Sequence, residues 1–238
     1  MIPARYEASR FPGKLIMDLA GKSVILRTYE ATKKSNLFDE VYVVTDSAII
    51  FNEIRLHGGK AIKSRKEHES GSDRIAEAVE NIDAEIVVNV QGDEPFTQRE
   101  PLSKLLEVFK NDIKKEIDIA SLMIKMTVES EIKDENNVKV VTDEQNFAMY
   151  FSRSPIPYPR EQSKAIYYKH IGIYAFRKEV LLKITKLPIN RLEAAEKLEN
   201  LRFLAHGLKV KMVETAHVAI GIDTPDDLEK ANAIFKNR

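Results

Sequence analysis

The segment "EIVVNVQGDEP", residues 85–95, indicates the fold class more directly than any other stretch of the chain. Its first half is a short apolar run rich in β-branched residues, which is typical of a strand buried on both faces. The run ends at a polar cluster from Gln91 to Pro95, where a turn is expected. Ligands of parallel sheets bind beyond the carboxyl ends of the strands. The segment therefore predicts a buried parallel strand followed by a loop that can carry function.

Upstream of this segment, strand and helix patterns alternate. Strands are expected over "VYVVT" (41–45) and "KAIKS" (60–64), and helices over "SVILRTYEATKKS" (23–35), "SAIIFNEIRLHGG" (47–59) and "GSDRIAEAVEN" (71–81). Ser23 is a suitable N-cap for the first helix, and Ser72 or Asp73 for the third. Such alternation is typical of βαβ units. It predicts an α/β fold with a mainly parallel sheet covered by helices on both faces.

Downstream, extended segments become more frequent. We expect strands over "DIASLMIKM" (118–126), "KHIGIYAF" (169–176) and "KVKMVE" (209–214), and a hairpin over 137–153 that turns near Asp143 to Asn146. Helices are expected over "RKEVLLKIT" (177–185), over 191–207 as one continuous helix, and after Thr224-Pro225. The apolar face of the 191–207 helix consists of Leu192, Ala195, Leu198, Leu201 and Ala205. Two interleaved lobes are therefore predicted.

The composition excludes several classes of protein. The 238 residues carry 37 Lys and Arg against 37 Asp and Glu, and this zero net charge argues against a general nucleic-acid-binding protein. The absence of cysteine excludes disulfides and thiolate metal sites. No apolar run approaches the ~18 residues of a membrane span, and Arg5 interrupts a signal peptide. We expect a soluble cytoplasmic protein.

The opening segment "IPARYEASRFPGK", residues 2–14, places three cations on one loop of small and turn-forming residues. Exposed backbone amides together with Arg5, Arg10 and Lys14 suit a triphosphate, so the anion site would be local. The alternative is an exposed basic turn. Neither a P-loop nor a G-x-G-x-x-G motif is present, which disfavours a dinucleotide-dependent oxidoreductase.

Two aspartates are candidates for a divalent-cation site. Asp93 directly follows the predicted strand of 85–90, and Asp223 follows an extended segment just ahead of the last helix. Converging carboxylates repel each other unless a cation lies between them, and oxygen ligands with phosphates are what magnesium prefers. The alternative for Asp223 is a carboxylate that only complements a helix start, and for Asp93 a turn residue.

Further polar residues are ambiguous from the sequence alone. His170 lies on a predicted strand, where a single histidine is more often packed or exposed than a ligand, and Arg153 is equally ambiguous. Glu193, Glu196 and Asn200 share one polar helix face, which usually faces solvent.

Seven motifs occur in an order that resembles the 3-deoxy-manno-octulosonate (Kdo) cytidylyltransferases, also called CMP-Kdo synthetases. They are "IPARYEASRFPGK", "SGSDRIAEAVE", "VVNVQGDEP", "VKVV…YFSRSPIP", "KHIGIYAFR", "LEAAEKLENLR" and "GIDTPDDLE". The resemblance extends over nearly the whole chain. Acylneuraminate cytidylyltransferases share the opening Arg and Lys pattern, but not "RFPGK" together with "NVQGDEP" and "GIDTPDDL".

The resemblance implies a Rossmann-like nucleotidyltransferase fold, with a mainly parallel central sheet flanked by helices, as one domain over residues 1–238. A nucleotide-binding part would span about 1–110 with 207–238, and a smaller interleaved lobe for sugar binding and dimerisation about 111–206. The implied reaction transfers CMP from CTP to the anomeric hydroxyl of Kdo, giving CMP-Kdo and pyrophosphate for lipopolysaccharide synthesis. The implied assembly is a homodimer.

The resemblance also implies roles for individual residues. Arg5 and Lys14 would bind the CTP phosphates with support from Arg10, and Ser72 and Arg74 would help form the nucleotide pocket. Gln91 and Asp93 would lie between nucleotide and sugar, and Asp93 with Asp223 would hold Mg²⁺. Arg5, Lys14, Asp93 and Asp223 are thus the expected catalytic residues. The residues expected to line the sugar site are Gln91, Arg153, His170, Glu193 and Asn200.

Two departures from the family pattern bear on these expectations. Family members carry several apolar residues ahead of "IPAR" that form the first and central strand, and this chain has almost none. Either the start is truncated, in which case the sheet would lose a buried strand, or the numbering omits residues. The family's "LEQLR" is "LENLR" here, which shortens a sugar contact at Asn200. The alternatives are a cytidylyltransferase for another acidic sugar, such as 8-amino-Kdo or a nonulosonic acid, or a catalytically silent nucleotide-binding homologue.

Overall fold

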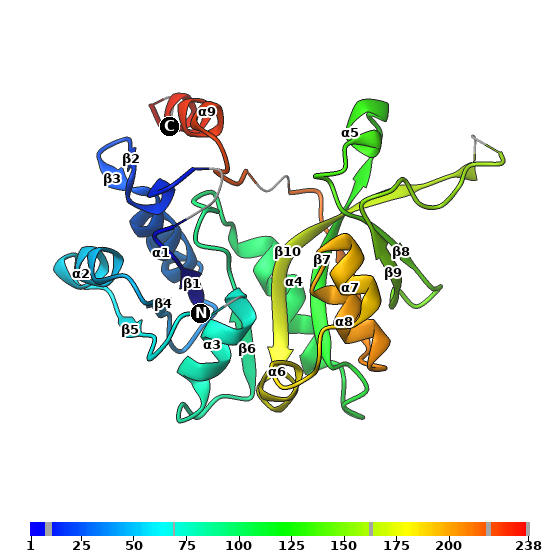
Figure 1. Ribbon diagram of the computed structural model, residues 1–238, viewed down its shortest axis with the longest axis horizontal. Coiled ribbons are helices and arrows are strands. Elements are labelled where there is room, and N and C mark those ends of the chain that lie inside the picture. Colours follow the sequence, from blue (N-terminus) through cyan, green and yellow to red (C-terminus); the bar gives the residue numbers. More distant parts are fainter. Residues whose placement is uncertain (8–10, 69, 162–163, 218–219, 237–238) are drawn as a thin grey trace. The chain divides into compact units, whose positions relative to one another are not determined.

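The computed structural model describes all residues except 8–10, 69, 162–163, 218–219 and 237–238. The chain forms two compact units: unit 1 comprises residues 1–102 with 219–238, and unit 2 comprises residues 103–218 (Figure 1). Both ends of the chain thus belong to unit 1. Among the described residues, no helix has the length and apolar character that crossing a membrane requires.

Unit 1 is built on a parallel sheet. Strands β1 (Ile2–Ala4), β4 (Val43–Thr45) and β5 (Ala61–Lys63) pair in the order β1-β4-β5. Met1 joins β1 to β6 (Ile86–Asn89), because its amino group donates to the Val88 carbonyl at 2.8 Å and its carbonyl accepts from the Val90 amide at 3.0 Å. The loss of the first strand, which was expected if the start is truncated, is not observed, because the buried residues of β1 form a strand at this place.

Of the two helix caps predicted in unit 1, one is confirmed and one is wrong. The remaining elements are η1 (Lys14–Ile16), β2 (Asp18–Leu19), β3 (Lys22–Ser23), α1 (Val24–Lys34), α2 (Ala48–Leu56), α3 (Gly71–Val79) and α9 (Pro225–Lys236). The Ser23 side chain caps α1, as predicted. Helix α3 is capped by Ser70 instead of Ser72 or Asp73, because the Ser70 hydroxyl accepts from the Asp73 amide at 3.0 Å. Ser72 lies inside the helix and is buried.

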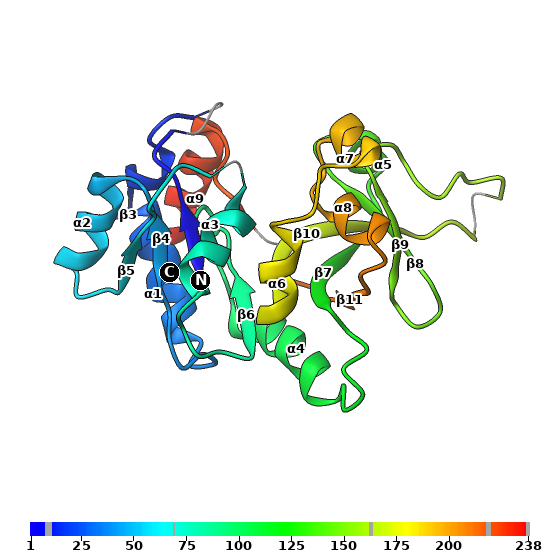
Figure 2. The same ribbon diagram turned by 60° about the horizontal axis from the view of Figure 1, so that its bottom comes forward.

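Unit 2 is built on a mixed sheet in the order β11-β7-β10-β8-β9 (Figure 2). Its strands are β7 (Ile119–Met126), β8 (Lys139–Thr142), β9 (Ala148–Ser152), β10 (Tyr167–Arg177) and β11 (Val210–Glu214), and its short helices are α5 (Glu129–Lys133) and α6 (Lys178–Ile184). Helix α4 (Arg99–Lys110) contains the boundary between the units. The β8–β9 hairpin turns as predicted, with the Asp143 amide bonded to the Phe147 carbonyl at 2.9 Å.

The expected single helix over 191–207 is wrong. The chain forms α7 (Arg191–Glu196), a left-handed residue at Lys197 with φ of 54°, and then α8 (Asn200–Ala205), beside β9. The predicted apolar face does not face the core throughout: Leu192 is 46% exposed, whereas Glu193 and Asn200 are buried. Polar contacts across the break therefore override the apolar period.

Candidate active site

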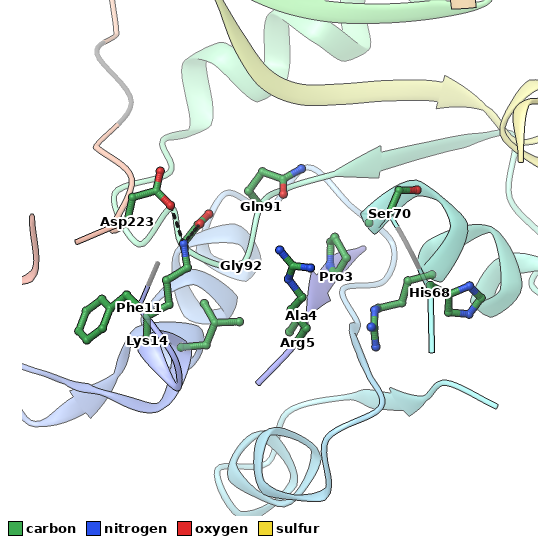
Figure 3. A pocket seen from close by; sticks show the side chains of 14 residues that line it. Pro3, Ala4, Arg5, Phe11, Lys14, His68, Ser70, Gln91, Gly92 and Asp223 are labelled. Atoms are coloured by element: carbon green, nitrogen blue, oxygen red, sulfur yellow. Dashed lines mark hydrogen bonds and ion pairs between the residues drawn. The ribbon is translucent and has the colours of Figure 1, made fainter. Parts of the chain in front are cut away.

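A cavity of about 270 Å³ lies in unit 1 beyond the carboxyl ends of β1 and β6 (Figure 3). Its lining includes six of the residues singled out from the sequence: Arg5, Lys14, Arg74, Gln91, Asp93 and Asp223. They come from the opening loop, helix α3, the loop after β6 and the segment ahead of α9. The expectation that polar groups distant in sequence share one crevice holds for these six residues, although Arg74 lies on a helix and no strand is described directly ahead of Asp223.

Lys14 connects the two candidate aspartates. Its Nζ lies 2.5 Å from Asp93 Oδ2 and 2.8 Å from Asp223 Oδ1 (Figure 3). Burial alone would lower the pKa of Lys14, but the charge of Asp93 and hydrogen bonds to both carboxylates outweigh it and raise that pKa. The two carboxylates thus converge on one cation, as their predicted placement required.

Local backbone geometry brings Asp93 and Lys14 into position. Lys14 follows Gly13, whose φ of 71° is readily adopted only by glycine, and the Gly13 amide is bonded to the Tyr6 carbonyl at 2.9 Å. Asp93 follows Gly92, where a Cβ atom would lie 3.1 Å from the Pro3 carbonyl oxygen. A glycine at position 92 therefore lets the loop after β6 pack closely against β1.

The backbone ahead of Asp223 differs from the extended segment that was expected. The described residues between β11 and Asp223 form no strand; the Ile222 amide is instead bonded to the Asp93 carbonyl at 3.0 Å. The carboxylate that caps the start of α9 belongs to Asp227, which accepts from the amides of Asp223 at 3.1 Å and Thr224 at 2.9 Å. Asp223 therefore presents its own carboxylate to Lys14 rather than capping the helix.

The remaining nucleotide candidates differ in their surroundings. Arg5 is exposed at the cavity and has no hydrogen-bond or ion-pair partner within the described part of the chain. Arg10 lies outside the described residues. The Arg74 side chain is buried and paired with Asp46, with Nη1 2.8 Å from Oδ1. Ser72 does not line the cavity, whereas its neighbours Ser70 and Gly71 do.

His68 also lines the cavity and was not predicted, because its spacing from the other histidines matches no metal-ligand pattern. Its Nε2 lies 2.8 Å from Glu77 Oε2. The signal that could have found it is its position two residues before "SGSDR", the motif that opens α3. Gln91 also lines the cavity, and its Nε2 donates to Asn89 Oδ1 at 3.3 Å.

In unit 2, His170 and Asn200 belong to one buried polar cluster around Tyr174. The His170 and Tyr174 rings lie 5.3 Å apart, and Asn200 is hydrogen-bonded to Tyr174. Asn200 Oδ1 is buried and has no hydrogen-bond partner among the described residues. A buried acceptor of this kind calls for a donor from a ligand or water. Burial lowers the pKa of His170 to about 3, so the ring is neutral at physiological pH.

Arg153 and Glu193 have contrasting partners. The Arg153 guanidinium contacts backbone carbonyls, with Nε 2.7 Å from Glu196 O and Nη1 3.0 Å from Glu135 O, and has no carboxylate partner among the described residues. Both carboxylate oxygens of Glu193 are occupied by Arg202, at 2.7 and 2.5 Å. Arg153 thus keeps capacity for an anion, whereas Glu193 is neutralised inside unit 2.

The comparisons with known proteins agree with the motifs. A protein-family model described as "Cytidylyltransferase" matches residues 1–212. The chain is 63% identical to a 3-deoxy-manno-octulosonate cytidylyltransferase of Flavobacterium johnsoniae (100% of this chain, 98% of the relative) and 60% identical to one of Christiangramia forsetii (99% and 95%). A solved structure of a CMP:2-keto-3-deoxy-manno-octonic acid synthetase complexed with CTP superposes with a TM-score of 0.94 at 41% identity, covering 99% of this chain and 97% of that one.

Proposed function

The chain belongs to the cytidylyltransferase family, and from this premise we propose that it transfers CMP from CTP to the anomeric hydroxyl of Kdo. The products are CMP-Kdo and pyrophosphate. The observation that carries the proposal is the convergence of Lys14, Asp93 and Asp223 in a cavity that Arg5 also lines. Cations for a triphosphate and carboxylates for a divalent metal are the groups that nucleotidyl transfer requires.

Arg5 and Lys14 are proposed to bind the phosphates of CTP. Arg5 is supported by its exposure at the cavity and by the lack of a partner among the described residues. Lys14 is held by two carboxylates, so binding CTP would move its ammonium from an aspartate oxygen to a phosphate oxygen. In the transition state these cations would neutralise charge that builds up on the leaving pyrophosphate.

Asp93 and Asp223 fit a divalent metal, and we propose that this metal is Mg²⁺. The fit rests on the donor set: two carboxylates already share one cation, the Lys14 ammonium, and magnesium prefers one or two carboxylates with phosphates and water. No group of three or more His, Cys, Asp or Glu suited to a metal occurs among the described residues, so phosphate oxygens would complete the site. When bound, the metal would neutralise phosphate charge and make the sugar hydroxyl more acidic.

Arg153, His170 and Asn200 are proposed to bind the sugar in unit 2. The Arg153 guanidinium lacks a carboxylate partner among the described residues, which suits the carboxylate of Kdo. His170 is neutral, and Asn200 Oδ1 lacks a donor within the described part of the chain, which suits sugar hydroxyls. Glu193 was expected to contact the sugar, and its pairing with Arg202 supports a positioning role instead. Gln91, which lines the cavity, is proposed to contact both the nucleotide and the sugar.

We further propose that the enzyme is a cytoplasmic homodimer supplying CMP-Kdo for lipopolysaccharide synthesis. Unit 2 exposes several large apolar side chains that a second copy could cover: Met149 (64% exposed), Tyr158 (85%), Ile166 (50%), Ile189 (56%) and Leu192 (46%). Sedimentation equilibrium of the purified chain tests the assembly, with a dimer expected and a monomer at micromolar concentration contradicting it.

Pyrophosphate release with a substrate panel tests the proposed function. The reaction contains magnesium, one of CTP, ATP or GTP, and one of Kdo, 8-amino-Kdo or a nonulosonic acid. CTP with Kdo should give the fastest release, because the curated relatives that the chain matches are Kdo cytidylyltransferases. Faster release with another sugar would reassign the substrate. No release from any combination, with CTP still bound, would make the chain a silent nucleotide-binding protein.

A further inference from the structure

The starting observation is a polar contact between two strands of unit 2. Strands β7 and β10 pair antiparallel, with His170 opposite Met123. Side chains two residues apart on a strand share a face, so Ser121 lies diagonally opposite His170 on the same face of the sheet. The Ser121 Oγ and the His170 Nε2 are 3.0 Å apart, and both residues are buried.

Ser121 also forms hydrogen bonds at a β-bulge in β10. The register advances by three residues on β10 but by one on β7, since Ile171 pairs with Leu122 and Tyr174 pairs with Ser121. Carbonyls in such a bulge lose ladder partners. The Ser121 Oγ compensates, because it donates toward the carbonyl oxygens of Ile171 at 3.1 Å and Ile173 at 2.9 Å.

Donor counting then fixes the direction of the Ser121–His170 hydrogen bond. A serine hydroxyl carries one proton and two lone pairs. Carbonyl oxygens only accept, so the single proton of Ser121 is directed to Ile171 and Ile173. The hydroxyl must therefore accept from His170, which places the ring proton on Nε2 and leaves Nδ1 with its lone pair.

The surroundings of the ring favour the neutral form and leave Nδ1 available. The ring packs edge-on against Phe151 at 5.1 Å between centroids, and burial keeps the imidazole uncharged at physiological pH. No described residue is hydrogen-bonded to Nδ1, and Nδ1 is not among the fully buried atoms that lack a partner. Nδ1 thus offers an acceptor at the edge of the buried cluster.

We propose that Ser121 is a positioning residue that locks His170 in the Nε2–H tautomer, so that Nδ1 accepts a hydrogen bond from a hydroxyl of the acidic sugar. The functional part rests on the proposed function, which assigns His170 to the sugar. The tautomer itself does not depend on that assignment. Ser121 contacts no substrate; it acts through the orientation and proton position of the ring.

NMR of the protein labelled with ¹⁵N-histidine tests the tautomer directly. Two-bond correlations between ring protons and nitrogens distinguish Nε2–H, Nδ1–H and doubly protonated rings, and the His170→Gln spectrum assigns the signal. At neutral pH, His170 should show the Nε2–H pattern, and in Ser121→Ala it should become a mixture of the two tautomers. An Nδ1–H or doubly protonated ring in the wild-type protein would overturn the inference whatever the activity.

Steady-state kinetics test the functional part. Ser121→Ala should raise the KM for Kdo by about tenfold with the KM for CTP unchanged, the effect of one weakened hydrogen bond. Ser121→Thr keeps the hydroxyl on a β-branched residue suited to a strand, and should restore the KM. An equal rise of the KM values for Kdo and CTP in Ser121→Ala would contradict the positioning role. So would an unchanged KM for Kdo in Ser121→Ala if NMR shows that His170 is a mixture of tautomers in this variant.

A matched pair at His170 keeps the test independent of how well the Ser121 variants fold. The amide oxygen of Asn in His170→Asn can take the place of Nδ1, whereas the longer amide in His170→Gln reaches only the place of Nε2. His170→Asn should therefore bind Kdo more tightly than His170→Gln does, by about threefold to tenfold, the effect of one hydrogen bond. The reverse order would overturn the acceptor role of Nδ1. If no variant or wild-type protein turns over Kdo, the proposed function fails while the NMR result still decides the tautomer.

Discussion

The polar clusters of the two units keep their titratable groups in opposite charge states: Lys14 is charged and His170 is neutral. In unit 1, Lys14 stays charged because Asp93 and Asp223 surround it, and its pKa rises. In unit 2, His170 has no charged partner among the described residues, and burial lowers its pKa to about 3. The first cluster is suited to binding phosphate and metal through charge. The second is suited to distinguishing a sugar by hydrogen bonds between neutral groups.

This difference explains why the charged site is easier to recognise in a single sequence than the neutral site. The charged cluster uses Arg, Lys and Asp at strand ends, where their presence is unusual and the spacing is visible. The neutral cluster uses serine, histidine, tyrosine and asparagine on strands and a helix, where each is an ordinary residue. The following predictions test this contrast, from the largest expected effect to the smallest.

The largest effect is expected from removing one carboxylate of the charged cluster. Asp93→Asn and Asp223→Asn should each lower kcat by about 10³-fold, the scale of losing a group that stabilises charge in a transition state. Chelation of divalent cations should abolish activity, and Mg²⁺ or Mn²⁺ should restore it. Asp226→Asn, an exposed acid in the first turn of α9, is the control and should behave as wild type. Wild-type kcat in Asp223→Asn across a magnesium titration would remove that residue from the site.

The next effect concerns the cation between the carboxylates. Lys14→Ala should lower kcat/KM by about 10²-fold, because a charge-assisted contact to phosphate is lost in the transition state. Arg5→Ala should act similarly, with little change in melting temperature because the side chain is exposed. Lys22→Ala removes a surface pair with Glu30 and serves as the control. Unchanged kinetics with a lowered melting temperature would make Lys14 a structural residue.

The neutral His170 of the second cluster should make the stability of the protein depend on pH. The folded-state pKa of His170, about 3, lies below its ordinary value of 6.5, so only the unfolded chain takes up this proton between those values. The free energy of unfolding should therefore fall as the pH drops below 6.5, by about 2 kcal/mol at pH 5. Urea denaturation at pH 7 and pH 5 should show this loss in the wild-type protein and a smaller one in His170→Gln. Equal losses in both proteins would contradict a buried neutral histidine.

Removing the imidazole should affect one substrate only. His170→Ala should raise the KM for Kdo by about tenfold and leave the KM for CTP unchanged, because the ring lies in unit 2 and one hydrogen bond is lost. His206→Ala, at an exposed helix end, is the matched control. A defect confined to CTP would show that the roles of the two clusters are interchanged.

The smallest effect is expected at Asn200. Its Oδ1 has no partner within the described residues, so a longer amide could reach a sugar hydroxyl that asparagine does not. Asn200→Gln should lower the Kd for Kdo by about threefold, the scale of one improved hydrogen bond. Titration calorimetry without CTP measures this binding. An unchanged Kd would assign the position to packing.

The charged cluster could be predicted because its residues follow elements with clear sequence patterns. β6 is a short apolar run that ends at a polar loop, and ligands of parallel sheets bind beyond such strand ends. The position of Asp93 followed from this rule, whereas that of Asp223 did not, because the described residues directly ahead of it form no strand. The partner that joins them did not, because Lys14 was assigned to phosphate and no local pattern shows a contact over 209 positions.

The resemblance singled out His170 and Asn200, but the contacts of the neutral cluster could not be predicted, because they are tertiary contacts that contradict the local periodicity. The apolar residues of 191–207 predict one helix, yet the chain breaks at Lys197, where Glu193 pairs with Arg202 across the break. The bulge in β10 likewise leaves no mark on the sequence except Gly172. For Ser121, the sequence predicts only a position on a strand. Burial of polar groups is decided by their partners, and a single sequence does not show those partners.

The kcat of the double variant Asp93→Asn/Asp223→Asn tests the central claim, that two distant carboxylates serve one cation. Residues that hold the same ion act as a unit, so the second substitution has little left to remove. The account predicts a loss of about 10³-fold to 10⁴-fold in the double variant, close to either single variant. A loss near 10⁶-fold, the product of the two single effects, would show that the aspartates act independently and would contradict the shared site.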